Sequence, residues 1–216
     1  MIPTLYHYSH CPFCIRVRLA AGYLGINYET KLIRYDDEQT PMKLTGSKML
    51  PIWVNENGNA INESLDIISL IDIEDKFQTK KTINTPEWKT FETTLSDAGN
   101  YIHNLAMPYF IYTKEFDENS RAYFQRKKEV KRGSFEVLVK NRSLFERELN
   151  ECLAKIEQDI SKFYRSETLS LYDVVLASHL WGMYVVPEFQ FTPKLHSYLQ
   201  EVKKLCKFNY AEDLWK

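Results

Sequence analysis

The sequence predicts two structural parts, an α/β domain over residues 1–76 and an all-helical domain over residues 85–216, joined by a polar linker at 77–84. Two observations lead to this prediction. Short β-prone runs alternate with helical patterns in the first third of the chain, with an Asn-Gly hairpin signal at 57–58. Beyond the linker, apolar residues recur only at helical spacing. A chain of 216 residues can bury a core of this size.

The first unit is a strand, a helix and a second strand. Residues 2–8 are rich in Ile, Leu and Tyr and predict a buried strand. Pro12 fits the first turn of a helix, because its missing N–H would have no intrahelical partner there, and Gly25 fits a helix end. Residues 28–33 alternate and predict a second strand. Strand, helix and strand together predict a right-handed parallel crossover.

A short helix, a hairpin and a longer helix complete this domain. The Thr-Pro pair at 40–41 predicts the N-cap and first residue of the short helix. Residues 50–54 predict a third strand with proline at its start, and 59–61 a fourth, with Asn57-Gly58 as a two-residue turn between them. The longer helix is expected from Glu63-Ser64 to about residue 76.

The second part is predicted to contain helices only. Thr85-Pro86 starts one whose apolar stripe runs to Leu105, and Pro108 is expected to break it. Capping boxes predict two further helix starts, at Ser143 and at Ser170 with Asp173, because an acidic residue follows each serine at the third position. The remaining predicted starts are Ser120 and Thr192.

Composition and charge exclude several classes of function. The net charge is −1, and no basic stripe suits nucleic acid, so the basic run 126–132 is interpreted as a solvated helix face. No apolar run approaches the roughly 20 residues that span a bilayer. Because the N-terminus lacks a basic segment followed by an apolar one, we expect a cytoplasmic protein without membrane contact.

The pair Cys11 and Cys14, in the order Cys-Pro-Phe-Cys at a strand-to-helix turn, predicts thiol–disulfide chemistry. Disulfide exchange needs a thiolate, and the N–H groups and dipole at a helix N-terminus stabilise one. Cys11 is therefore the expected exposed nucleophile. Cys14, one turn further along, is the expected buried resolving thiol. Arg16 and His10 can add positive charge nearby.

Other interpretations of the cysteines stay open at this stage. Both thiols of the pair could be structural, or an iron–sulfur cluster could be shared by two subunits through Cys11. Zinc would need two further ligands; His7 and His10 are near, but there is no second cysteine pair, so no metal is expected. His10 is interpreted as a solvated loop residue rather than an acid or base. Cys152 and Cys206 are expected to be small core residues.

Three further features have both a plain and a functional interpretation. Leu50-Pro51 can be an ordinary strand start, or its backbone can face Cys11 and a substrate peptide. Glu63-Ser64 can simply cap a helix, or the helix N-terminus can bind a carboxylate. Lys48 can be a solvated loop lysine or can neutralise a ligand carboxylate.

Together these residues resemble a known family. The ordered set Cys11-Pro-Phe-Cys14, Leu50-Pro51 and Glu63-Ser64, followed by an all-helical half, resembles glutaredoxins fused to a glutathione-transferase-like helical domain, the bacterial glutaredoxin 2 type. The second half adds the matching runs 123–129 and 133–135. The resemblance covers essentially the whole chain.

The resemblance implies a thioredoxin-like fold for residues 1–76 and glutathione as co-substrate. It implies that Cys11 attacks and Cys14 resolves, and that protein disulfides or glutathionylated proteins are the partners. The chain is expected to be a monomer. The implied glutathione contacts are Leu50 for the cysteinyl backbone with Pro51 in the cis form, Glu63 and Ser64 for the γ-glutamyl end, and Lys48 for the glycine carboxylate. Phe13 departs from the pattern, since tyrosine is commoner there; the missing hydroxyl bears on Cys11 acidity.

Two other functions share this architecture. The alternative enzyme is a glutathione transferase that conjugates electrophiles, and the non-enzymatic alternative is a scaffold or ion-channel-like relative. Neither needs a resolving thiol, so Cys14 favours redox chemistry.

Overall fold

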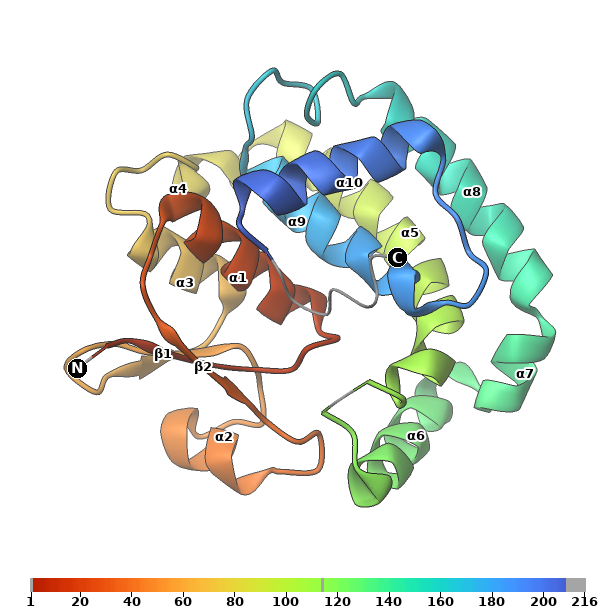
Figure 1. Ribbon diagram of the computed structural model, residues 1–216, viewed down its shortest axis with the longest axis horizontal. Helices are drawn as coiled ribbons and strands as arrows, with labels where there is room; N and C mark the ends of the chain where they lie inside the picture. The colour runs from red at the N-terminus through yellow and green to blue at the C-terminus, as the bar shows by residue number, and fades with distance from the viewer. Residues whose placement is uncertain (1, 114, 209–216) are drawn as a thin grey trace.

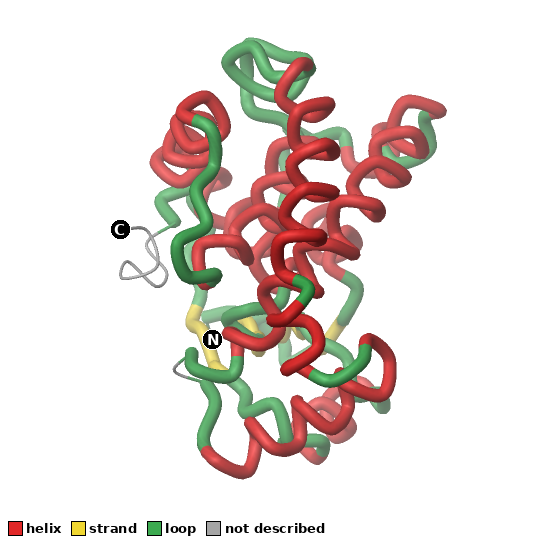
Figure 2. Tube along the Cα trace, turned by 90° about the vertical axis from the view of Figure 1, so that its right-hand side faces the viewer, coloured by secondary structure: helices red, strands yellow, loops and turns green. Residues whose placement is uncertain are grey.

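The computed structural model describes residues 2–113 and 115–208. Figure 1 shows a small sheet with helices α1 and α3 on one face and α2 on the other, beside a second part built from helices. Figure 2 shows the strands gathered in the lower half of the molecule, with long helices above them. The predicted architecture, an α/β part followed by a helical part, is confirmed.

The sheet has four strands in the order β2-β1-β3-β4. Strand β1 (Thr4–His7) pairs in parallel with β2 (Glu29–Leu32), which confirms the predicted parallel pairing. On its other side β1 pairs antiparallel with β3 (Ile52–Val54), and β3 pairs antiparallel with β4 (Ala60–Ile61). β1 is a central strand, and the loop between its C-terminal end and helix α1 lies on the side of the sheet toward the helical part (Figure 1).

The hairpin loop between β3 and β4 is one residue longer than predicted. Asn55 donates its N–H to the carbonyl of Asn59 at 3.0 Å, so the loop between them has three residues. Gly58 donates its N–H to the carbonyl of Asn55 at 3.0 Å and takes a φ of 83°. A turn closed by a residue in the left-handed region is the usual form of a three-residue hairpin loop, and glycine adopts it without strain.

Helix α1 (Pro12–Leu24) follows the sequence prediction closely. Cys11 is its N-cap residue, and Gly25 ends it in the left-handed conformation with φ 69°. The helix packs against α3 within its own part and against α9 of the helical part. Gly22 lies so close to the end of α10 that an added Cβ would meet the carbonyl oxygen of Cys206 at 1.7 Å. Only glycine allows this approach between the two parts.

The start of one helix and the end of another differ from the prediction, and an aspartate side chain binds backbone N–H groups at each of them. Helix α2 (Gln39–Thr45) begins after Glu38, so Thr40 is not its N-cap. The carboxylate of Asp37 instead accepts the Thr40 N–H at 2.9 Å and the Thr40 hydroxyl at 2.7 Å. Helix α3 (Ser64–Ile71) stops short of residue 76. The Asp72 carboxylate accepts the N–H groups of residues 76 and 77 at 3.0 and 2.7 Å, which folds this stretch into a turn.

The helical part confirms three predicted helix starts. Thr85 and Thr192 accept hydrogen bonds from the third following residue, and Ser170 forms the predicted capping box with Asp173. The helices are α4 (Thr79–Thr82), inside the expected linker, α5 (Pro86–Phe110), α6 (Glu118–Arg132), α7 (Phe135–Lys140), α8 (Arg142–Gln158), α9 (Leu171–Leu180), the 3-10 helix η1 (Trp181–Val185) and α10 (Pro193–Leu205).

Three predictions in this part are wrong. Pro108 lies inside α5, because a proline so near the C-terminal end removes a single backbone hydrogen bond and the helix continues to Phe110. Helix α6 is capped by Asp117, which accepts the Ser120 N–H at 2.9 Å. Ser143 caps nothing: it lies in the first turn of α8, and the serine that caps a helix here is Ser134, at the start of the unpredicted α7.

One hydrophobic core runs through both parts. It extends from Leu5 of the sheet through α1 and α3 to the aromatic and aliphatic side chains of α5, α8, α9 and α10. A smaller cluster on the sheet holds Tyr8, Cys14, Ile33, Leu50 and Ile52. Within residues 2–113 and 115–208, no helix combines the length and the apolar character needed to cross a bilayer. The shared core fixes the helical part against the loop that carries Cys11.

Candidate active site

The two cysteines of the motif lie in different surroundings. Cys11 has an extended backbone (φ −79°, ψ 121°), and its carbonyl accepts the N–H groups of Cys14 and Ile15 at 3.0 and 2.9 Å. Its thiol is partly exposed. Cys14 is fully buried, and its Sγ accepts the Tyr8 N–H at 3.4 Å. All four cysteine thiols of the chain are free in the structure.

The local electrostatics separate the acidities of the two thiols. A hydrogen bond from the Cys14 thiol, together with the charge of His10 and the N–H groups of Phe13 and Cys14, lowers the pKa of Cys11 to about 6 against the opposing effect of burial. Burial and the hydrogen bond to Cys11 raise the pKa of Cys14. At neutral pH this arrangement favours a thiolate on Cys11 and a protonated thiol on Cys14.

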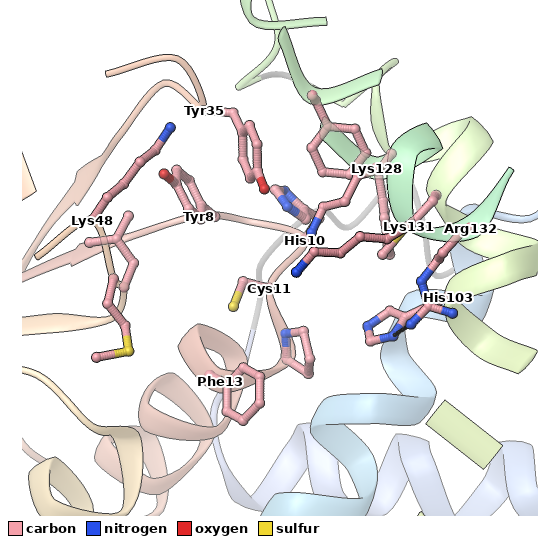
Figure 3. A pocket seen from close by; sticks show the side chains of 16 residues that line it. Tyr8, His10, Cys11, Phe13, Tyr35, Lys48, His103, Lys128, Lys131 and Arg132 are labelled. Atoms are coloured by element: carbon pink, nitrogen blue, oxygen red, sulfur yellow. Dashed lines mark hydrogen bonds between the residues drawn. The ribbon is translucent and has the colours of Figure 1, made fainter. Parts of the chain in front are cut away.

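Cys11 opens into a cavity of about 380 Å³ between the two parts. Figure 3 shows Cys11 with Lys48 on one side and the basic residues of α6 on the other. The lining residues are Tyr8, His10, Cys11, Pro12, Phe13, Tyr35, Lys48, Met49, Leu50, His103, Met107, Phe110, Phe124, Lys128, Lys131 and Arg132. The cavity is therefore formed by residues of both parts, and it is large enough to hold a small peptide ligand.

The basic run of α6 is only partly a solvated face, contrary to expectation. Lys128, Lys131 and Arg132 line the cavity. Burial lowers the pKa of Lys128; the Cys11 thiolate acts in the opposite direction, and the charges of Arg132 and Lys131 lower it further. Among the described residues, none of these three side chains forms an ion pair with a carboxylate, whereas Lys127 lies 3.5 Å from Glu38. These three side chains thus bring positive charge to the cavity that no carboxylate of the described residues pairs with.

His10 is not the solvated loop residue that the sequence suggested. Its side chain is only 8% exposed, and its Nδ1 lies 2.8 Å from Oε1 of Glu115. Four aromatic rings surround the imidazole at centroid distances of 5.2 to 5.5 Å, those of Tyr8, Phe110, Phe116 and Phe124. A loop residue becomes buried here because the segment between α5 and α6 folds over it.

The residues expected to hold glutathione are only partly brought together. Lys48 and Leu50 line the cavity, and the Leu50-Pro51 bond is cis. The Lys48 Nζ donates to the Tyr123 hydroxyl at 2.9 Å and pairs with Glu38 at 3.2 Å, so it is not a free loop lysine. Pro51 is buried and is not part of the lining.

Glu63 and Ser64 lie at the N-terminus of α3, outside the lining of the cavity. Glu63 has a φ of 71°, and Ser64 is the first helical residue and is buried. The Ser64 Oγ accepts a hydrogen bond from Nη1 of Arg16 at 3.4 Å. The Arg16 guanidinium is buried and lies 4.7 Å from the centre of the Phe13 ring, which links this helix end to the Cys-Pro-Phe-Cys turn.

The remaining cysteines lie away from the cavity. Cys206 is fully buried at the end of α10, and burial raises its pKa to about 12. Cys152 is partly exposed on α8 and packs against the core; burial raises its pKa as well. Both sites favour the protonated, unreactive thiol. In the part of the chain that the structure describes, no three His, Cys, Asp or Glu side chains gather as a potential metal site.

Sequence reasoning missed the contributions of the helical part. Lys128, Lys131 and Arg132 stand three and four residues apart and therefore share one helix face, a signal that was present in the sequence. Glu115 carried no such signal, because its partner His10 is 105 positions away. His103 and Phe124 join the lining only through tertiary packing.

Comparisons with known proteins agree with this architecture. The family model described as the C-terminal domain of glutaredoxin 2 matches residues 90–212, and the N-terminal domain of glutathione S-transferase matches residues 10–73. Glutaredoxin 2 of Escherichia coli strain K12 is 27% identical over 215 residues, an alignment that covers 97% of this chain and 98% of that protein.

Solved structures show the same relationship. Glutaredoxin 2 of Salmonella typhimurium, in complex with glutathione, superposes with a TM-score of 0.85 at 27% identity and covers 99% of both chains. A glutathione S-transferase of Ceriporiopsis subvermispora shares the fold, with a TM-score of 0.74 at 15% identity and 98% of each chain covered. Since the glutaredoxin 2 model spans more than half of the sequence, the chain belongs to the glutaredoxin 2 family of glutathione-dependent oxidoreductases.

Proposed function

We propose that this protein reduces protein disulfides and protein–glutathione mixed disulfides, with Cys11 as the nucleophile and glutathione as the reductant. The observation that carries the proposal is the placement of the two thiols. Cys11 opens into a cavity between the two parts with a lowered pKa, and Cys14 lies buried directly behind it. This is the division between attacking and resolving thiol that reduction of a protein disulfide by a pair of cysteines uses.

The reaction on a glutathionylated protein proceeds in two exchanges. The Cys11 thiolate attacks the glutathione sulfur of the mixed disulfide, and the substrate protein leaves as its thiolate. The thiolate of a second glutathione then attacks the glutathione sulfur bound to Cys11, which releases oxidised glutathione and restores the Cys11 thiolate. The low pKa of Cys11 helps twice, because it supplies the attacking thiolate and makes Cys11 a good leaving group.

Reduction of a protein disulfide uses Cys14 as well. After Cys11 forms a mixed disulfide with the substrate, the Cys14 thiol loses its proton and attacks Cys11. The substrate leaves reduced, and a Cys11–Cys14 disulfide remains, which two glutathione molecules reduce. The raised pKa of Cys14 keeps it protonated until Cys11 is no longer a thiolate.

We assign glutathione to the side of the cavity formed by Lys48 and Leu50. The Leu50 backbone next to cis Pro51 would bind the cysteinyl segment, and Lys48 the glycine carboxylate. Glu63 and Ser64 would hold the γ-glutamyl end at the N-terminus of α3, where backbone N–H groups bind carboxylates. The bound glutathione in the Salmonella typhimurium glutaredoxin 2 structure supports this ligand.

The basic face of α6 predicts a measurable contribution to glutathione recognition. Lys128 and Lys131 lie across the cavity from the side assigned to glutathione, so they would act through the attraction of their charge for the anionic tripeptide and not through direct contact. We expect the double variant Lys128→Gln/Lys131→Gln to raise the KM for glutathione roughly 3- to 10-fold, since each exposed charge interaction is worth up to about 1 kcal/mol. Steady-state kinetics measure it. The matched control is Arg126→Gln/Lys127→Gln, which removes the same charge from the same helix outside the cavity lining. An equal rise in both double variants would contradict a role for the cavity-facing lysines.

The glutathione transferase function remains the second candidate because the fold is shared. The two candidates separate in one experiment, in which the protein is assayed for glutathione-dependent reduction of a small disulfide and for conjugation of glutathione to an aromatic halide. We expect rapid reduction and little conjugation, because Cys11 itself is the thiolate that reacts. Efficient conjugation with little disulfide reduction would instead establish the transferase function.

A further inference from the structure

A buried ion pair joins the helical part to the residue before Cys11. Glu115, in the segment between α5 and α6, accepts two hydrogen bonds from His10 through Oε1, at 3.1 Å from the backbone N–H and at 2.8 Å from Nδ1. The Glu115 side chain has no exposed surface, and that of His10 is 8% exposed.

The surroundings of Glu115 favour its ionised form. Burial raises the pKa of Glu115, but the hydrogen bond and charge of His10 and the hydroxyl of Thr113 outweigh it and lower the pKa to about 2. The Thr113 hydroxyl donates to Oε2 at 2.8 Å, so both carboxylate oxygens have donors. A buried carboxylate is costly unless a cation or hydrogen bonds compensate it, and His10 is the basic side chain within contact.

The same contact orients His10. The Glu115 carboxylate faces Nδ1 at 2.8 Å, within the distance of an ion pair. The ring is also fixed in place by Tyr8, which stacks on it at an interplanar angle of 18°, and by Phe124, which meets it edge-on at 86°. The imidazole of His10 therefore sits next in sequence to Cys11 and shares the cavity wall with it.

Other titratable groups near this pair do not replace Glu115. His7 and His103 are mostly uncharged at neutral pH, because burial, followed by the charge of Arg18 and of Arg132 respectively, lowers the pKa of each to about 4. Burial also raises the pKa values of the neighbouring phenols Tyr8 and Tyr35, which stay neutral. The other cationic side chains that line the cavity on this side are Lys128, Lys131 and Arg132.

We propose that Glu115 is a positioning residue of the thiol reaction: from the helical part, it holds His10 as a cation beside Cys11 and so stabilises the Cys11 thiolate. The helical part would then influence the reactivity of Cys11 in the α/β part, in addition to forming one wall of the cavity. The inference rests on the proposed function only in taking Cys11 as the reacting thiol.

The test is the pH dependence of Cys11 alkylation by iodoacetamide, followed by mass spectrometry of the full-length protein. In Glu115→Gln the amide keeps the size of the side chain but not its charge, so the cationic ring is no longer favoured. We expect the apparent pKa of Cys11 to rise by roughly 1 unit, which slows alkylation about fivefold near pH 6 and little above pH 8. A purely structural role for Glu115 would not shift this profile.

The companion variants define what would overturn the proposal. His10→Gln should shift the profile by the same amount as Glu115→Gln. The double variant Glu115→Gln/His10→Gln should shift it by no more than either single variant. The control is Glu118→Gln, which removes an exposed carboxylate at the start of α6 and should leave the profile unchanged. If Glu115→Gln lowers the apparent pKa or leaves it unmoved, or if the two shifts add, the proposal is wrong. If Glu115→Gln does not fold, the His10→Gln profile decides by the same criterion. Alkylation needs neither glutathione nor a disulfide, so this result is independent of the reductase assay.

Discussion

Cys11→Ser should abolish glutathione-dependent disulfide reduction. A serine hydroxyl is not ionised at neutral pH and does not exchange with disulfide sulfur, so the first step has no nucleophile. Loss of a covalent nucleophile costs roughly 10³-fold or more in rate. Steady-state reduction of a small disulfide by glutathione measures the effect. The fold should survive, because the Cys11 thiol is only partly buried and the substitution is close in size.

Cys152→Ser is the matched control for this result. Cys152 is also a partly exposed thiol, but it lies on α8, and burial raises its pKa rather than lowering it. This variant should keep the wild-type rate. A Cys11→Ser protein that still reduces disulfides at a substantial fraction of that rate, or a Cys152→Ser protein that does not, would place the nucleophile elsewhere.

Cys14→Ser should separate the two activities of the enzyme. Release of glutathione from a mixed disulfide needs only Cys11 and a second glutathione, and should stay within a few-fold of wild type at pH 8. Reduction of a protein disulfide needs the resolving thiol, and should fall by two orders of magnitude or more, on the order of the loss of an intramolecular attack. Parallel assays with a glutathionylated peptide and a disulfide-linked protein measure both.

The choice of pH matters for Cys14 variants because Cys14 also sets the acidity of Cys11. Its thiol hydrogen bond is the largest influence that lowers the pKa of Cys11. A serine hydroxyl can still donate this bond, whereas Cys14→Ala cannot, so the alanine variant should show the higher Cys11 pKa and lose activity first as the pH falls from 8 to 6. Equal loss of both activities in Cys14→Ser would contradict the division of labour.

Local sequence signals predicted most of the α/β part and several helix starts. The proline at position 12, the glycine at position 25 and the Ser170–Asp173 capping box all act over a few residues, and each is confirmed. Competing local signals produced the errors. Ser143 suits a helix cap locally, but α8 begins one residue earlier, at Arg142, because Asn141 both ends α7 and precedes α8.

The candidate site likewise contains some residues that local sequence signals predict and others that they do not. Cys11 and Cys14 are recognisable because the motif is contiguous and its helix is predictable. The partners that tune Cys11 are not, since Glu115 reaches His10 across the boundary between the two parts. Burial of His10 and the orientation of α6 toward the cavity both follow from how the helical part packs on the sheet. The spacing of the α6 cations shows in the sequence that they share a helix face, but the side to which that face turns and the partner of His10 depend on tertiary structure.

The most direct test of the central claim is to trap the glutathione intermediate. Cys14→Ser protein treated with oxidised glutathione should gain one glutathione per chain, and peptide mapping should locate it on Cys11. Addition of reduced glutathione should release it. An adduct on Cys152 or Cys206 instead of Cys11, or a protein that gains no glutathione while folded, would contradict the assignment of Cys11 as the thiol that exchanges with glutathione.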